Sequence, residues 1–213
     1  MARRRLDRES QARIDRTYQF ALFFLCLFVV TSSFGAISGS QSLLASSVFA
    51  VFGALAAVVA LLRVTRALRL KRNAEESSRG KIEFIVVAFT SMGIVAATVA
   101  LFFSSLHMLF SRTLFPPGMS AAWTAVLVAA AIWGVSWKFR HGMDASQREG
   151  LEEIFALLDA GFVVSVLIVL VVLLSRMGCT ALDGVFAILE EMLLIGAGLF
   201  FLYRSLTRLG RNG

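Results

Sequence analysis

Charged residues are scarce in this chain. They make up 16% of its 213 residues, whereas soluble globular domains carry roughly 25%. Hydrophobic residues account for 58% of the chain, and its mean hydropathy is +0.78. A soluble fold of this size has no interior large enough to hide so much apolar surface. The composition therefore excludes a soluble domain and predicts an integral membrane protein.

Side chains for covalent or metal chemistry are also few. The chain has two cysteines, Cys26 and Cys179, and two histidines, His107 and His141. Each cysteine lies in a different part of the chain, so we expect no disulfide. The histidines fall at opposite sides of the predicted membrane, so they cannot meet. No zinc-protease helix motif, Gly-rich phosphate loop or Ser-His pair is present. We therefore expect a protein that is not an enzyme and needs no cofactor.

Six apolar runs are long enough to cross a membrane as helices. A helix needs about 20 apolar residues to cross a hydrocarbon core about 30 Å thick. The runs are unbroken, which argues against the alternating strands of a membrane barrel. We therefore predict an all-α bundle of six transmembrane helices. The predicted spans are Tyr18–Ile37, Leu43–Leu62, Ile82–Leu106, Ala121–Trp137, Ile154–Leu174 and Val185–Tyr203.

The basic residues indicate the direction of the spans. Of the 21 Lys and Arg residues, all but Arg112 and Arg176 precede span one or follow spans two, four and six. Cytoplasmic loops of membrane proteins collect basic residues. Both termini are therefore predicted to be cytoplasmic, in a multi-pass protein of the bacterial inner membrane. The net charge of +7 then reflects topology and lipid headgroup contacts, and we expect no nucleic-acid partner.

Three regions are expected along the chain. A basic cytoplasmic segment covers residues 1–17, the transmembrane domain covers residues 18–203, and a short cytoplasmic tail covers residues 204–213. The basic segment fits a helix on the membrane surface and a solvated segment equally well. After span two, four arginines at three-residue spacing from Arg63 to Arg72 predict that the helix continues beyond the membrane.

Small residues recur at a spacing that lets two helices approach closely. Two examples are Gly35-x-x-x-Gly39 and Gly93-x-x-x-Ala97. This spacing serves packing within one chain or packing between two copies. The sequence leaves both interpretations open, and a homodimer is the expected assembly.

Carboxylates inside the apolar spans are candidates for function, because charge is costly there. Asp159 lies in span five, and Glu190 and Glu191 lie in span six. Glu83 opens span three, where we expect it to reach the interface. Asp183 precedes span six and is expected to cap that helix. For Glu190 and Glu191, a structural hydrogen bond and a role in an ion pathway are both open.

Three further segments carry a family resemblance. They are Ser40-Gln-Ser-Leu-Leu-Ala45 before span two, Gly80-Lys81-Ile82-Glu83-Phe84 at the start of span three, and Leu182-Asp183-Gly184 at the start of span six. With the span order, the loop lengths and the topology, they resemble the cation diffusion facilitators. These are six-helix antiporters that exchange a divalent metal ion for protons. The resemblance implies a divalent-cation transporter working by proton-coupled alternating access, in a member lacking the family's C-terminal cytoplasmic domain.

The family's metal ligands are largely missing here. They form two pairs, each pair four residues apart, on spans two and five, so that each pair shares one helix face. The resemblance places these positions at Phe49 and Gly53 on span two and at Phe155 and Asp159 on span five. Phe49, Gly53 and Phe155 are degenerate, and Asp159 is the remaining candidate metal ligand.

Other oxygen atoms offer replacements for the lost ligands. Ser46 lies one turn before the first vacated position on span two, and Glu152 lies two turns before Asp159. Together with Glu190 or Glu191 they would form an ion pathway of oxygen ligands only. Such a site favours Mn²⁺ or Mg²⁺ over zinc.

Two alternatives stay open. In the first, Phe49 and Phe155 pack against each other at a site that has lost its metal, and the chain is a transport-inactive interaction or dimerisation partner. In the second, the same scaffold transports a different solute.

Overall fold

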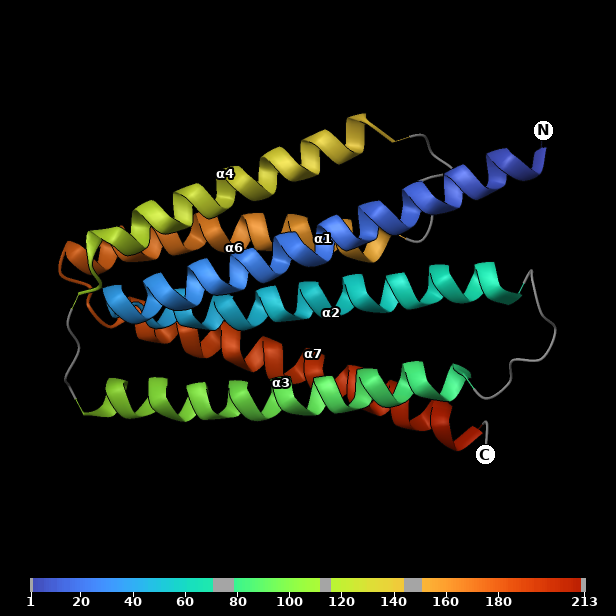
Figure 1. Ribbon diagram of the computed structural model, residues 1–213. Helices are drawn as coiled ribbons and strands as arrows, with labels where there is room; N and C mark the ends of the chain where they lie inside the picture. The colour runs from blue at the N-terminus through green and yellow to red at the C-terminus, as the bar shows by residue number, and fades with distance from the viewer. Residues whose placement is uncertain (1, 71–78, 112–115, 144–150, 212–213) are drawn as a thin grey trace.

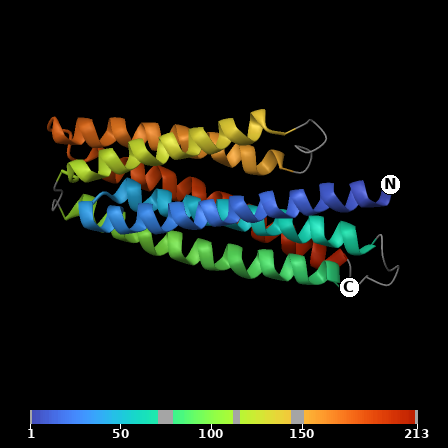
Figure 2. The ribbon, with the colours of Figure 1, turned by 45° about the horizontal axis from the view of Figure 1, so that its top comes forward.

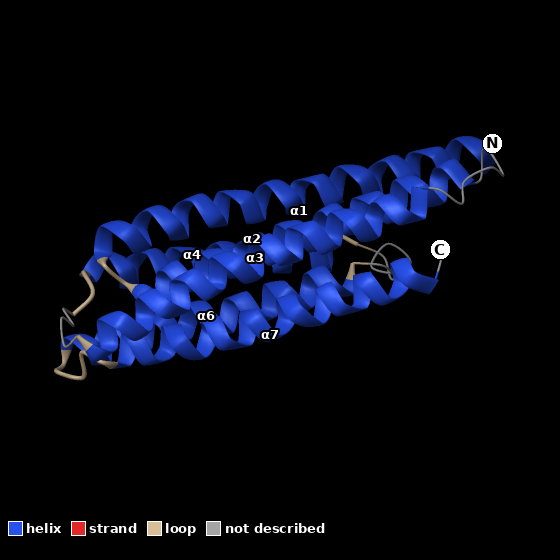
Figure 3. Ribbon diagram, turned by 90° about the horizontal axis from the view of Figure 1, so that it is seen from below, coloured by secondary structure: helices blue, strands red, loops and turns tan. Residues whose placement is uncertain are grey.

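The computed structural model describes residues 2–70, 79–111, 116–143 and 151–211. Within these ranges the chain forms six long helices that lie along a common axis and no strand (Figures 1 and 3). The predicted all-α architecture is confirmed. The helices are α1 (Ala2–Ser38), α2 (Gln41–Leu70), α3 (Arg79–Phe110), α4 (Met119–His141), α6 (Glu152–Arg176) and α7 (Leu182–Arg211).

Each helix contains a stretch long and apolar enough to span a membrane, as predicted. The mean hydropathy of these stretches ranges from 1.6 to 2.9. A helix satisfies its backbone hydrogen bonds within itself, which is what a segment inside lipid requires. The six stretches are Ile14–Ser38, Gln41–Leu62, Ile85–Phe110, Met119–His141, Glu152–Arg176 and Leu182–Thr207.

Both chain termini lie at the same end of the bundle (Figures 1 and 2). We call this the terminal end, and the opposite end, where α1 turns into α2 and α6 turns into α7, the far end. His107 lies in the last turn of α3 and His141 ends α4, so these histidines lie at opposite ends. The structure thus agrees with an even number of crossings, and which end is cytoplasmic stays a prediction.

The first helix extends beyond its predicted span. α1 is continuous from Ala2 to Ser38, and its first residues project past the other helices (Figure 1). At about 1.5 Å per residue, a helix of 37 residues is roughly 55 Å long, which exceeds the hydrocarbon core. Residues 2–17 therefore continue the α1 axis instead of forming a separate element. Likewise, α2 continues to Leu70, which confirms the predicted extension of span two.

The helices pack around α2. The most extensive contacts are those of α1 with α2, α3 with α7, and α4 with α6, and α2 also contacts α3, α6 and α7. Gly35 marks a tight approach of α1 to α2, because a Cβ added there would lie 3.0 Å from Leu44. Gly39 has φ +69° and forms the turn between these helices. Gly93 faces open space, so Gly93-x-x-x-Ala97 takes no part in packing within the chain.

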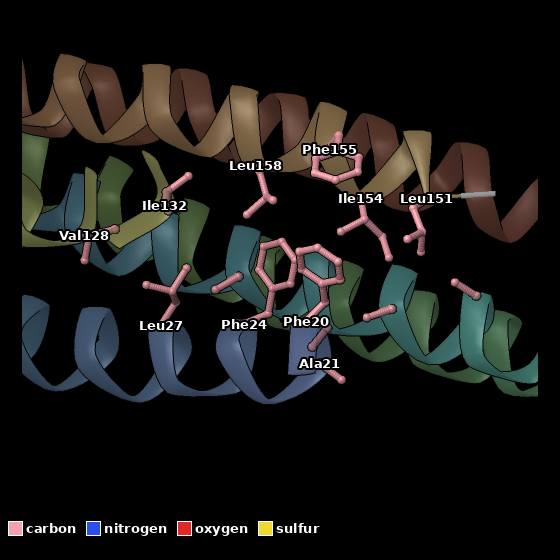
Figure 4. Packing of buried hydrophobic residues seen from close by; sticks show 14 of the residues in the cluster. Phe20, Ala21, Phe24, Leu27, Val128, Ile132, Leu151, Ile154, Phe155 and Leu158 are labelled. Atoms are coloured by element: carbon pink, nitrogen blue, oxygen red, sulfur yellow. The ribbon is translucent and has the colours of Figure 1, made fainter. Parts of the chain in front are cut away.

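A hydrophobic cluster joins α1, α2, α4 and α6 (Figure 4). Phe20 and Phe24 of α1 point toward Phe155 and Leu158 of α6, with Ile132 of α4 beside them. The rings of Phe20 and Phe155 pack edge to face, with centroids 5.9 Å apart. This cluster fills the region in which the family resemblance places a metal site.

Candidate functional site

On α2, an aromatic ring occupies the space beside a position that the family resemblance assigns to a metal ligand. A Cβ added at Gly53 would overlap the ring of Phe24, which is 1% exposed. The space that a ligand side chain at position 53 needs is therefore already filled. Glycine at this position is what lets Phe24 pack against the α2 backbone.

Phe49 and Phe155 also serve packing, each with its own partner. A Cβ added at Gly161 of α6 would lie 3.0 Å from the Phe49 ring, so this ring sits on the α6 backbone. Phe155 packs against Phe20 of α1, in a different hydrophobic cluster from Phe49. The three degenerate positions thus hold α1, α2 and α6 together.

Asp159 forms an ion pair with Arg140 of α4. Arg140 Nη2 donates to Asp159 Oδ2 at 2.5 Å, and the guanidinium lies 5.4 Å from the centre of the Phe155 ring. Asp159 is 58% exposed, whereas Phe155, one turn earlier on α6, is buried. The carboxylate therefore points away from the interior of the bundle. The Arg140 side chain already balances its charge.

Ser46 and Glu152 lie apart from this ion pair. The Ser46 hydroxyl donates to the Leu43 carbonyl of its own helix at 2.9 Å. Glu152 is exposed in the first turn of α6, where a negative charge interacts favourably with the helix dipole. Glu83 was expected to reach the membrane interface, and its side chain lies outside the part of the chain that the structure describes.

Glu190 and Glu191 are buried within the span of α7. Their exposed fractions are 6% and 1%. The Ser105 hydroxyl of α3 donates to Glu191 Oε1 at 2.9 Å. In the described part of the chain, neither Glu190 oxygen nor Glu191 Oε2 has a hydrogen-bond partner. Unpaired buried oxygens are rare and costly, so this pair stands out as a place for a ligand or proton.

The buried pair and Asp159 lie at different depths. Asp159 is 17 residues from Arg176, where α6 reaches the far end, and Glu190 is eight residues from Leu182, where α7 leaves it. At about 1.5 Å per residue, these positions lie roughly 25 Å and roughly 12 Å from the far end. The candidate oxygens on α6 and α7 therefore do not share one coordination sphere. Among the described residues, no three His, Cys, Asp or Glu side chains are grouped to hold a metal ion.

Asp183 caps a different helix from the predicted one. It lies in the first turn of α7, and its carboxylate accepts from the backbone N–H of Gln41 at 2.7 Å. The hydroxyls of Ser40, at 3.0 Å, and Ser42 also donate to it. The expectation that Asp183 caps its own helix was wrong, because the start of α2 lies close enough to take the carboxylate. In the sequence, the two serines that flank Gln41 were the sign of this contact, because they place two further hydroxyl donors at the start of α2.

Two of the three family-like segments meet in this contact. Ser40-Gln-Ser and Leu182-Asp183-Gly184 are more than 130 residues apart in sequence, and Asp183 joins them at the far end. No protein-family model and no curated protein matches the sequence. A function for this chain therefore has to be argued from the chemistry of its described side chains.

Proposed function

We propose that this chain is a divalent-cation transporter of the cation diffusion facilitator type, in which Glu190 and Glu191 bind the transported ion. The observation that carries this proposal is the burial of two adjacent carboxylates inside a membrane span, with three of their four oxygens unpartnered among the described residues. Ionisable groups inside a membrane are costly, and they mark ion and proton pathways in many membrane proteins.

The charge of the pair matches a divalent ion. Two carboxylates carry two negative charges, so one divalent cation leaves the site neutral in its apolar surroundings. Two protons achieve the same neutrality. Exchange of one cation for two protons therefore avoids leaving an unbalanced charge in the bundle. The proposed metal ligands are carboxylate oxygens, with the Ser105 hydroxyl nearby. Oxygen ligands favour Mn²⁺ or Mg²⁺ over zinc.

Asp159 has a supporting role in this proposal. The Arg140 guanidinium occupies the position beside the Asp159 carboxylate that a bound cation would take. The pair links α4 to α6 in the half of the bundle nearer the terminal end. Transport through Asp159 is the competing assignment, and the two assignments make opposite predictions for single substitutions.

The test is cation flux into liposomes that contain the purified protein, followed with a metal-sensitive dye inside and a pH dye. We expect flux of Mn²⁺ or Mg²⁺ with counterflow of protons in the unchanged protein. Glu190→Gln and Glu191→Gln should each abolish flux, because the amide keeps the size but not the charge. Asp15→Asn, at an exposed carboxylate of α1, is the control and should leave flux unchanged.

Asp159→Asn separates the two assignments. With Glu190 and Glu191 as the ion site, this variant should lower protein stability more than it lowers flux per folded molecule. Loss of all flux in Asp159→Asn together with normal flux in Glu190→Gln would move the ion site to α6.

A second candidate function is a transport-inactive interaction partner. The filling of the family's metal site by Phe24, Phe49 and Phe155 favours it, since these rings leave no room for ligands there. Absence of flux for every divalent ion tested, with correctly folded protein in the liposomes, would favour this candidate.

A further inference from the structure

An apolar groove of about 370 Å³ lies between α6 and α7. The two helices are close at the far end, where the chain turns from one into the other, and separate toward the terminal end with α2 between them (Figure 1). α2 forms the floor of the groove, with Phe52, Leu55 and Val59. Ala156 of α6 and Phe200 of α7 line it and are exposed, so the groove opens on the surface of the bundle.

The length of the groove matches one leaflet of a bilayer. Along α7 its lining runs from Leu194 to Ser205, and along α2 from Phe49 to Val59. A helix rises about 1.5 Å per residue, so each stretch is roughly 15 Å long. This is half of a hydrocarbon core about 30 Å thick. An acyl chain of a lipid in one leaflet extends over the same distance.

The polar atoms of the groove gather at the terminal end. They belong to Arg204 and Ser205 of α7 and to Glu153 of α6. Glu153 already takes part in another interaction. The Arg204 side chain is exposed and makes no hydrogen bond or ion pair with the side chains that the structure describes. An exposed guanidinium at the headgroup end of an apolar groove is complementary to a phosphate ester that carries an acyl chain.

We propose that this groove binds a membrane phospholipid of the leaflet at the terminal end. One acyl chain lies between α6 and α7 on the floor formed by α2, and Arg204 donates to the phosphate. The lipid fills the space where α6 and α7 separate. This site is distinct from Glu190 and Glu191, so it does not depend on which ion the protein carries.

Native mass spectrometry in mild detergent tests the site. The unchanged protein is titrated with phosphatidylglycerol and with phosphatidylcholine of the same chain length. We expect one tightly bound lipid, with phosphatidylglycerol preferred. Ala156→Phe fills the groove and should weaken lipid binding more than tenfold. Arg204→Gln should weaken phosphatidylglycerol binding about fivefold, the factor expected for one basic residue near an anionic surface.

Two matched variants control for general effects. Ala130→Phe adds the same ring on the exposed face of α4, and Lys138→Gln removes one positive charge at the terminal end away from the groove. Both should bind lipid as the unchanged protein does. Circular dichroism checks that each variant is folded, and Arg204→Gln, at an exposed position, keeps the test decisive if Ala156→Phe fails to fold.

Three outcomes would overturn the proposal. The first is wild-type lipid binding in folded Ala156→Phe or in Arg204→Gln. The second is an equal loss in the control variants, which would mean general adhesion of lipid to the bundle. The third is displacement of the lipid by millimolar inorganic phosphate, which would identify a site for a free anion.

Discussion

At the scale of single residues, the side chains at the positions that the family resemblance assigns to a metal site serve packing and an internal ion pair. Gly53 makes room for Phe24, Phe49 rests on Gly161, and Asp159 is neutralised by Arg140. At Gly53 and Phe49 the result is a hydrophobic contact, and at Asp159 it is an ion pair.

Gly53→Ala should destabilise the protein. The added methyl group overlaps the buried Phe24 ring, and overpacking of this kind costs about 1–3 kcal/mol. Gly93→Ala is the matched control, because nothing lies within 4 Å of a Cβ at this position. In the control, the better helix propensity of alanine is worth up to about 1 kcal/mol. Thermal unfolding followed by tryptophan fluorescence should show a lower Tm for the first variant and an unchanged or higher Tm for the second.

A zinc site engineered on the family's ligand pattern requires removal of the Phe24 ring. Phe49→His, Gly53→Asp and Phe155→His supply the missing ligands, yet the Phe24 ring occupies the space of the new Asp side chain. We expect this triple variant to bind zinc weakly and the same variant with Phe24→Ala to bind it at least tenfold more tightly in calorimetry. Equal zinc affinities for the two variants would contradict the role of Phe24.

At the scale of helices, the start of α2 depends on a side chain from α7. Asp183 accepts the Gln41 N–H and two serine hydroxyls, so one carboxylate satisfies three donors at the far end. These bonds join the first turn of α2 to the first turn of α7. Buried hydrogen bonds to a charged acceptor are worth about 1.5–3 kcal/mol each.

Asp183→Ala should therefore cost at least about 2 kcal/mol of stability, because the donors of α2 lose their acceptor. Asp183→Asn keeps one oxygen acceptor and should lose less. The measurement is the midpoint of thermal unfolding in detergent for both variants. Equal losses for Asn and Ala would show that removal of the negative charge, and not of the acceptor oxygen, sets the cost.

At the scale of the whole molecule, the structure brings both termini to one end of the bundle, and the basic residues predict that this end is cytoplasmic. The native cysteines provide a test, because both are free and exposed. Cys179 lies at the far end, between α6 and α7, whereas Cys26 lies inside the span of α1.

A membrane-impermeant maleimide added to intact cells should label Cys179. The reagent reaches the outer side only, and a cysteine buried in lipid at position 26 is not accessible to it. Cys26→Ser should be labelled as strongly as the unchanged protein, and Cys179→Ser should give no signal. Labelling of Cys179 only after cell lysis would place the far end in the cytoplasm and reverse the predicted topology.

The sequence by itself determined the class of protein, the number of spans and their approximate limits. These features depend on local composition, since a run of about 20 apolar residues forms a helix in lipid whatever its neighbours are. It also identified Glu190 and Glu191 as carboxylates inside a span, because position in the run was enough. The continuation of α2 to Leu70 was predictable from the three-residue spacing of the arginines that begin at Arg63.

Only the tertiary structure decided what those side chains meet. The sequence of a span does not specify how its helix is rotated about its own axis. The rotation of α6 turns Asp159 outward to Arg140, and the rotation of α7 keeps Glu190 buried. The contact of Asp183 with the start of α2 joins residues more than 140 positions apart. Contacts of this kind arise from the packing of one helix on another, and no local pattern of hydropathy or charge specifies them.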